Sequence, residues 1–304
     1  MFFTPAVLGY LAIEYVTLKL PTSYAAISEY MEAEAPAIEV LVLGSSQMKG
    51  GINPAYLSQP TLNLAAGNQH HDTDFKLLQQ LLDKFPKLQT VVLETSYSHF
   101  ELPHNGKHFW KNNIYLKYYG VNNFERNTYF KDKMIYLSNP PFYSGRILDH
   151  YSAEGRRYGF NRFAYDTLNY YGLFKDLGYD ETKISKEKTF KINKTPSKDI
   201  FEVNSNLFLE MLTYLEDKNI SVVLCKAPMY KTYLPQRVPE ILARRDSLVD
   251  EVKTRFNNVS VLSLETDTIH FNARDYWNQS HLNPTGGEKF TKMLDGHLQK
   301  TAPN

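Results

Sequence analysis

Two residues that are far apart in the chain could together form a nucleophile and its base. Ser46 ends the segment Leu-Gly-Ser-Ser at 43–46, directly after an apolar run, and His281 is the first residue of the segment His-Leu-Asn-Pro-Thr-Gly-Gly at 281–287. A serine hydroxyl is a poor nucleophile at neutral pH unless a neighbouring imidazole accepts its proton and later protonates the leaving group. The two segments therefore predict acyl transfer through a serine if the fold brings them together.

Alternating strands and helices predict a fold that would do so. Short apolar runs predict strands at 38–43, 61–64, 88–93, 220–224 and 259–264, and amphipathic stretches predict helices at 72–82, 206–218, 238–256 and 285–298. Apolar strands separated by amphipathic helices are typical of a parallel sheet covered on both faces. We expect an α/β protein with three α/β/α layers and a flavodoxin-like parallel sheet. The Ser46 turn and the loop before His281 then lie at the carboxyl ends of strands, where functional groups gather.

Both segments resemble sequence blocks of the SGNH/GDSL hydrolase superfamily. Ser46 matches the serine of the first block, Gly-Asp-Ser, with Ser45 in place of the aspartate. The segment Asn-Gln-Ser-His-Leu-Asn-Pro-Thr-Gly-Gly at 278–287 resembles the last block, in which Asp-x-x-His is followed by Leu-Asn and a helix start with glycine. The resemblance covers the sheet-forming parts, about 40–100 and 200–295. It implies the SGNH hydrolase fold, with Ser46 as nucleophile and His281 as general base.

The resemblance also implies where the oxyanion donors lie. The N–H groups of Ser46 and Gly67 match the family's first two donors, although Gly67 could equally be an ordinary turn glycine. The third block, Gly-x-Asn-Asp, is missing after the third strand, and Ser96 is near the place of its asparagine. Asn68 is another candidate donor. Loss of one oxyanion donor costs on the order of 10²–10³ in rate.

A second departure from the family concerns the acid of the triad. Asn278 is three residues before His281, where the family has aspartate, and Asp275 is the nearest carboxylate in the sequence. An amide oxygen can orient an imidazole but cannot stabilise an imidazolium by charge, and an Asp-to-Asn change in a serine-protease triad costs about 10⁴ in kcat. We expect either Asn278 or Asp275 to orient His281.

Within the superfamily, the layout resembles the membrane-anchored bacterial proteins of cell-surface polymer acylation, which act in D-alanyl transfer or O-acetylation. The resemblance implies a serine-dependent esterase or O-acyltransferase acting on acylated carbohydrate or another ester, such as a cell-surface polysaccharide. The two departures motivate an alternative. In it the protein is a catalytically impaired SGNH-fold protein that binds a glycan or a membrane-bound acyltransferase.

The N-terminal segment, residues 1–30, is expected to be helical and to precede an SGNH-like domain at 31–304. Its first twenty residues are mostly apolar but include Glu14 and Lys19. We favour a truncated membrane anchor, which would place the domain at the extracytoplasmic face of a bacterial membrane. The alternative is an amphipathic helix packed on a soluble domain through a stripe that includes Tyr10 and Glu14.

The interval from about 103 to 197 interrupts the alternation of strands and helices. It is rich in Tyr and Asn and ends in a Lys-rich stretch. A loop of this length would be unusual in a compact domain. We therefore expect a largely helical, aromatic-rich cap after the third strand. Its aromatic residues would pack the cap on the sheet or line a substrate cleft.

Charge and residue types argue against several other functions. The net charge of +1 does not favour a nucleic-acid partner. A single cysteine, Cys225, excludes an internal disulfide and paired-cysteine metal motifs. The group His70, His71, Asp72 and Asp74 is more typical of a helix start than of a metal site. We expect no metal, no cofactor and no nucleic acid.

Overall fold

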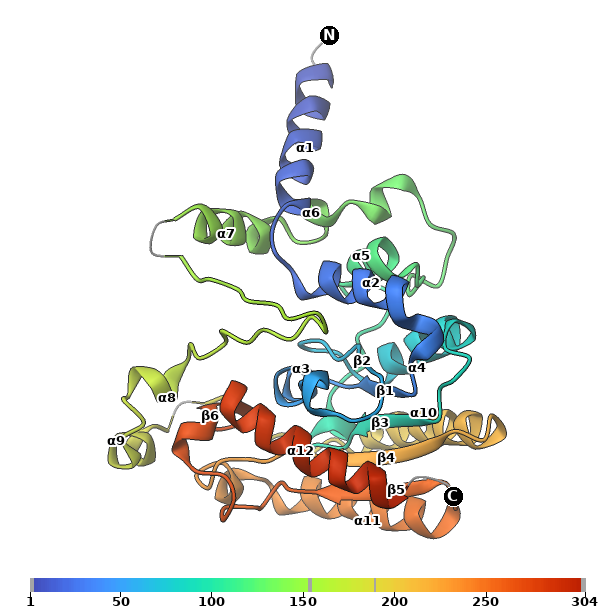
Figure 1. Ribbon diagram of the computed structural model, residues 1–304, viewed down its shortest axis with the longest axis vertical. Helices are drawn as coiled ribbons and strands as arrows, with labels where there is room; N and C mark the ends of the chain where they lie inside the picture. Colours follow the sequence, from blue (N-terminus) through green and yellow to red (C-terminus); the bar gives the residue numbers. More distant parts are fainter. Residues whose placement is uncertain (1–2, 153–154, 189, 302–304) are drawn as a thin grey trace.

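A five-stranded parallel sheet lies at the centre of the protein. The structure is a computed structural model and describes residues 3–152, 155–188 and 190–301 (Figure 1). The strands lie in the order β2-β1-β3-β4-β5, and each neighbouring pair is parallel. The order 2-1-3-4-5 confirms the flavodoxin-like sheet. All five predicted strands are present, as β1 (Val40–Leu43), β2 (Thr61–Asn63), β3 (Thr90–Glu94), β4 (Ser221–Lys226) and β5 (Val259–Ser263).

Helices cover both faces of the sheet and make the predicted three-layer α/β/α fold. Because side chains alternate along a strand, Leu41 and Leu43 enter one core while Val40 and Val42 enter the other. The first core is completed by α2 (Ser23–Glu34), α4 (His71–Leu81), α10 (Lys198–Asp217) and α11 (Pro239–Arg255). The second is completed mainly by α3 (Ser46–Gly51) and α12 (Pro284–Thr301).

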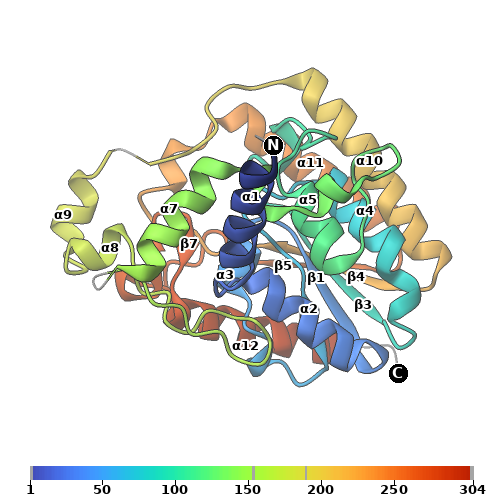
Figure 2. The same cartoon turned by 90° about the horizontal axis from the view of Figure 1, so that it is seen from above.

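A short antiparallel hairpin that we did not predict precedes α12. It consists of β6 (Tyr276–Asn278) and β7 (His281–Leu282), and it pairs Asn278 with His281. Strand β7 contacts α3, and Figure 2 shows the two elements side by side. The hairpin thus holds the histidine segment against the start of α3, where Ser46 lies.

The interval expected to be a helical cap is less helical than predicted. Its helices are α5 (Asn112–Ile114), a π-helical turn (Tyr115–Tyr119), α6 (Ile135–Ser138), α7 (Pro140–Tyr151), α8 (Leu173–Asp176) and α9 (Glu181–Lys186). Among the described residues of this interval, only α7 is longer than two turns. Polar side chains bond the backbone elsewhere, as where Asp166 Oδ1 accepts from the N–H groups of Gly159 and Leu168, and such bonds compete with helix formation. Residues 153, 154 and 189 of this interval lie outside the described part.

Single 3-10 turns complete the backbone. They are Ala35–Ala37, Pro54–Tyr56, Leu82–Lys84, His99–Glu101, Phe130–Lys133, Leu234–Gln236 and Ala273–Asp275.

The N-terminal helix α1 (Phe3–Leu18) projects from the cap (Figure 1). It contacts α6 and α7, and the buried Glu14 carboxylate accepts hydrogen bonds from the N–H groups of Ile135 (2.7 Å) and Tyr136 (2.8 Å). Tyr10, which the alternative of a packed amphipathic helix placed in its stripe, is exposed. Among the described helices, none combines the length and apolar character needed to cross a membrane.

Candidate active site

Ser46 and His281 lie at hydrogen-bond distance. Ser46 Oγ is 2.8 Å from His281 Nε2, although 235 residues separate them in the chain. Ser46 is the first residue of α3, directly beyond the carboxyl end of β1, and His281 begins β7. The fold therefore brings a serine hydroxyl and an imidazole nitrogen into the contact that acyl transfer through a serine would require.

The turn before Ser46 requires a glycine at position 44. Gly44 has φ +134°, and a Cβ there would lie 2.7 Å from Glu94 Cβ and 2.9 Å from Met48 Cγ. The Gly44 N–H donates to Asp74 Oδ1 at 3.1 Å. Both the backbone conformation and the close approach of β3 therefore exclude larger residues here.

Glu94, the last residue of β3, accepts hydrogen bonds from the same turn, residues 44–46. Its Oε2 accepts from the Ser45 N–H at 2.6 Å, and its Oε1 accepts from the Ser45 hydroxyl at 3.0 Å. Ser45 is thereby turned toward Glu94 while Ser46 meets His281. We did not predict this role. A carboxylate directly after a buried strand, at the sheet edge that carries Ser46, was the signal that could have indicated it.

Glu94 is buried but charged. Burial alone would raise its pKa, but the facing His99 ring, with Nδ1 3.7 Å from Oε1, and the hydrogen bond from the Ser45 N–H outweigh burial and hold the pKa well below its usual range. Burial would likewise lower the pKa of His99, but the Glu94 carboxylate raises it above its ordinary value. A buried carboxylate that faces the His99 ring therefore supports the turn at residues 44–46.

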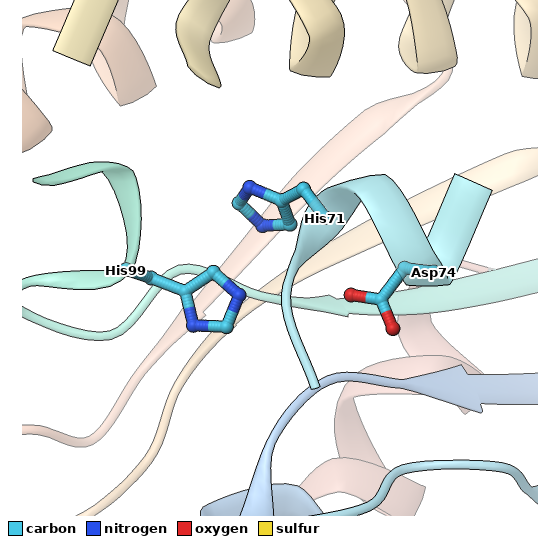
Figure 3. A group of neighbouring side chains, drawn as sticks. All are labelled: His71, Asp74 and His99. Atoms are coloured by element: carbon cyan, nitrogen blue, oxygen red, sulfur yellow. The ribbon is translucent and has the colours of Figure 1, made fainter. Parts of the chain in front are cut away.

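His71, Asp74 and His99 form a buried group in which each can offer one ligand atom within 4.8 Å of the others. Figure 3 shows the Asp74 carboxylate and the His99 ring facing each other. Zinc ligands lie about 2.0–2.2 Å from the metal, so these atoms would have to approach one another. His71 Nε2 already lies 3.0 Å from the Glu94 carbonyl oxygen, and Asp74 Oδ1 accepts from Gly44 and Gln69. These hydrogen bonds place His71 and Asp74 against the backbone of Glu94 and Gly44, so the group supports the turn at Gly44.

Asn278 contacts the ring nitrogen of His281 that faces away from Ser46. Its Oδ1 is 3.1 Å from His281 Nδ1 and also accepts from the Ser280 N–H at 2.9 Å. The Ser280 N–H can bond only to the amide oxygen of Asn278, so this oxygen, and not the amide nitrogen, is the atom near the ring. An oxygen acceptor next to Nδ1 requires a proton on Nδ1. Nε2 is then the free base that faces Ser46. The Ser280 hydroxyl, 3.0 Å from Nδ1, is a second partner that we did not predict.

Asp275 does not orient His281. Its Oδ2 accepts from the Asn272 N–H at 2.9 Å and pairs with Lys289 Nζ at 2.8 Å. The carboxylate is buried in these contacts, so it is not available to rotate toward the imidazole. Of the two expected orienters, only Asn278 contacts the ring.

The imidazole of His281 is poised to accept a proton. Burial lowers its pKa below the ordinary histidine value, and the negative charge of Glu94 opposes this shift only in part. His281 is therefore neutral at pH 7, the form that a general base requires.

Three of the four expected oxyanion donors, Ser46, Gly67 and Asn68, line the cleft, and Ser96 does not. Gly67 is next to Ser46: a Cβ built on Gly67 would be 3.9 Å from Ser46 Cβ. Among the described contacts, neither the Ser46 N–H nor the Gly67 N–H has an acceptor. Asn68 also lines the cleft, whereas Ser96 does not, because its hydroxyl donates to Gln47 Oε1 at 2.5 Å. Ser46, Gly67 and Asn68 are thus together at the site, and Ser96 is directed elsewhere.

A cleft of about 680 Å³ opens over Ser46 and His281. The cap supplies much of its wall, including the aromatic side chains Trp110, Phe142, Tyr158 and Phe160, and Trp277 of β6 faces it from the other side. The cleft also contains Lys111, which donates to the Gly67 carbonyl oxygen. Sequence reasoning missed Lys111 because nothing in the irregular cap placed it beside Gly67.

Comparisons with known proteins do not indicate a function, so we infer one from the side chains of the cleft. No protein-family model and no curated protein sequence matches the chain. A candidate acylhydrolase from Bacteroides fragilis is 10% identical, covers 88% of this chain and 92% of its own, and has a TM-score of 0.41. A candidate platelet activating factor from Streptococcus pneumonia is 10% identical, covers 96% and 99%, and has a TM-score of 0.42. Similarity of this degree carries no functional argument.

Proposed function

We propose that the protein is a serine-dependent esterase or O-acyltransferase that acts on acyl esters through Ser46 and His281. The contact of 2.8 Å between Ser46 Oγ and His281 Nε2, at the floor of a large cleft, carries this proposal. The SGNH-like segments around both residues support the same reaction class.

The reaction would proceed in two steps. His281 Nε2 takes the hydroxyl proton as Ser46 Oγ attacks the ester carbonyl, and the N–H groups of Ser46 and Gly67 bind the oxyanion. The bond to the alcohol then breaks, and His281 gives its proton to the departing oxygen. In the second step, a water molecule or a sugar hydroxyl loses its proton to His281 and attacks the acyl-Ser46 ester. The bond between the acyl carbon and Ser46 Oγ then breaks, and His281 returns the proton to Oγ, which frees the serine.

We further propose that the ester is borne by a carbohydrate, such as a cell-surface polysaccharide. Aromatic side chains from the cap and from β6 line the cleft. Flat aromatic faces pack well against sugar rings, because the C–H groups on a face of the sugar form an apolar surface.

Labelling with a fluorophosphonate probe tests the proposal. We expect the probe to modify Ser46, and Ser46→Ala to abolish labelling. Ser263→Ala is the matched control, because Ser263 is an exposed serine at the carboxyl end of β5, outside the cleft. Absence of labelling at any pH, or labelling that persists in Ser46→Ala, would contradict the proposal.

A second candidate function follows from Asn278. An amide, not a carboxylate, contacts His281, and a charge-free orienter leaves the imidazolium less stabilised. The protein would then be a catalytically impaired binder of a glycan or of a membrane-bound acyltransferase. Glycan binding that survives Ser46→Ala, without ester turnover by the unaltered protein, would favour this function.

We also propose that the protein works at the extracytoplasmic face of a bacterial membrane, with α1 at the lipid surface. Val7, Leu8 and Leu11 are exposed on α1. Such apolar side chains can enter the lipid interface. We expect flotation with anionic vesicles, and loss of flotation in the Leu8→Glu/Leu11→Glu variant. Flotation that does not depend on these two side chains would contradict a role for α1.

A further inference from the structure

The cleft above Ser46 holds more positive charge than its own carboxylates neutralise. Among the described residues of its wall, Asp166 is the single carboxylate. The chain as a whole has a net charge of only +1, so the excess is local. The cationic side chains of the wall are Lys49, Lys111, Arg146 and Arg156.

One of the four cations is neutralised within the cleft. Arg156 Nη2 is 3.4 Å from Asp166 Oδ2. Among the described contacts, the other three pair with no carboxylate: Arg146 donates to the Pro21 carbonyl oxygen and Lys111 to that of Gly67. Lys49 lies over the Tyr24 ring, with its ammonium 5.2 Å from the ring centroid.

These three charges are withdrawn from water to different degrees: Lys111 is buried, and Lys49 and Arg146 are half-buried. Lys111 is only 6% exposed, and burial lowers its pKa to about 8. Burial also lowers the pKa of Lys49, and repulsion by Lys111 and Arg146 adds to this effect against the opposing influence of Tyr24 and Asp166. Like charges that repel one another away from water are stabilised by a bound anion.

The positive charge is close to the reacting atoms. Lys111 Nζ is 3.6 Å from the Cβ position of Gly67, and Gly67 adjoins Ser46. Lys49 is on α3, three residues after Ser46. An anionic group bound here would belong to the same molecule as the ester that Ser46 attacks.

We propose that Lys49, Lys111 and Arg146 form an anion subsite, and that the protein acts on esters whose carbohydrate or other alcohol part carries a carboxylate or a phosphate. The inference rests on the proposed function for the reaction, but the charge of the cleft does not depend on it.

Three matched substrates test the subsite: methyl 3-O-acetyl-glucoside, the corresponding glucuronide, and the corresponding 6-phosphate. We expect kcat/KM to be at least tenfold higher for one or both anionic esters than for the neutral glucoside. The better of the two identifies the anion as carboxylate or phosphate. A smaller preference, or a preference for the neutral ester, would overturn the proposal.

Variants connect the preference to the subsite. Lys49→Gln and Arg146→Gln should each lower the ratio of anionic to neutral kcat/KM at least fivefold. Lys117→Gln is the control, because Lys117 is an exposed cap lysine outside the cleft and its loss should leave the ratio unchanged. A ratio that does not change in Lys49→Gln and Arg146→Gln would overturn the assignment.

Calorimetry with methyl glucuronide and methyl glucose 6-phosphate separates the subsite from the reaction. Binding that is lost in Lys49→Gln, in a protein that turns over no ester, would support the subsite and contradict the proposed function. Turnover of the neutral ester without anion preference or anion binding would contradict the subsite alone. Neither binding nor turnover would contradict both.

Discussion

The amide oxygen of Asn278 lies 3.1 Å from Nδ1 of His281, where a triad aspartate would place a carboxylate. The amide fixes the ring orientation and the tautomer but adds no charge when the ring becomes an imidazolium. Asn278 therefore supplies the orienting hydrogen bond of a triad aspartate without its negative charge.

Asn278→Asp should therefore raise esterase activity. A carboxylate at the same distance would stabilise the imidazolium, and because the reverse change costs about 10⁴ in a serine protease, we expect kcat to rise at least tenfold. Hydrolysis of an acetyl ester by purified protein measures the effect. The Ser46→Ala/Asn278→Asp double variant is the control and should be inactive. An unchanged or lower kcat in Asn278→Asp would contradict the assigned role of Asn278.

The acidic limb of the pH profile should lie below the ordinary histidine pKa of 6.5. Burial lowers the pKa of His281, so the imidazole stays neutral as pH falls through 6.5 and becomes protonated, and inactive as a base, only at lower pH. The pH dependence of kcat/KM for a neutral ester measures this limb. Asn278→Asp should shift its midpoint upward. A wild-type midpoint above 6.5 would contradict the burial of a neutral base.

The pH profile of kcat/KM should fall at alkaline pH when the substrate is an anionic ester. Burial lowers the pKa of Lys111 to about 8, and the side chain loses its charge as pH rises through that value. The kcat/KM for an anionic ester should then fall above pH 8. Lys111→Arg stays charged at all accessible pH values and should abolish this limb. A limb that is unchanged in Lys111→Arg would show that another group titrates.

Gly44→Ala should disrupt the nucleophile turn. The backbone at φ +134° disfavours a side chain, and the added Cβ would collide with Glu94 and Met48. We expect a loss of at least about 1 kcal/mol in unfolding free energy and loss of probe labelling at Ser46. Gly120→Ala serves as control, because Gly120 also has a positive φ but has open space around it. Equal effects on Ser46 labelling in both variants would contradict a specific role of the Gly44 turn.

Glu94→Ala should destabilise the protein more than Ser45→Ala. Removal of Glu94 leaves the Ser45 N–H buried without its acceptor and removes the carboxylate that faces the buried His99 ring, which costs about 1–3 kcal/mol for each unpaired group. Ser45→Ala removes one hydroxyl bond and should cost about 1 kcal/mol. Urea unfolding monitored by circular dichroism compares the two. Similar losses in both variants would contradict a charged Glu94.

Sequence patterns were sufficient for the sheet and for the meeting of Ser46 with His281. Each strand is a nearly continuous apolar run, and parallel strands bring their carboxyl ends to one edge, so residues after β1 and before α12 could be expected to converge. The β6–β7 hairpin was missed because two- and three-residue strands are too short to show a period of two.

The supporting side chains of the site were harder to predict. The position of Glu94 after a predicted strand was only a weak signal of its role, since a carboxylate at a strand end is usually solvated. Asp275 was an attractive orienter by sequence distance, but Asn272 and Lys289 already use its carboxylate. Two cations of the cleft wall, Lys111 and Arg156, lie in irregular parts of the cap, whose path comes from side-chain bonds to the backbone and not from periodicity.

Detection of an acyl-enzyme tests the central claim most directly. The protein would be mixed with an activated acetyl ester, quenched in acid within the first turnover, digested and analysed by mass spectrometry. We predict one added acetyl group on the peptide that contains Ser46, and none in Ser46→Ala or in His281→Ala. Ester turnover without acetylation of Ser46, or an adduct on another residue, would contradict the account.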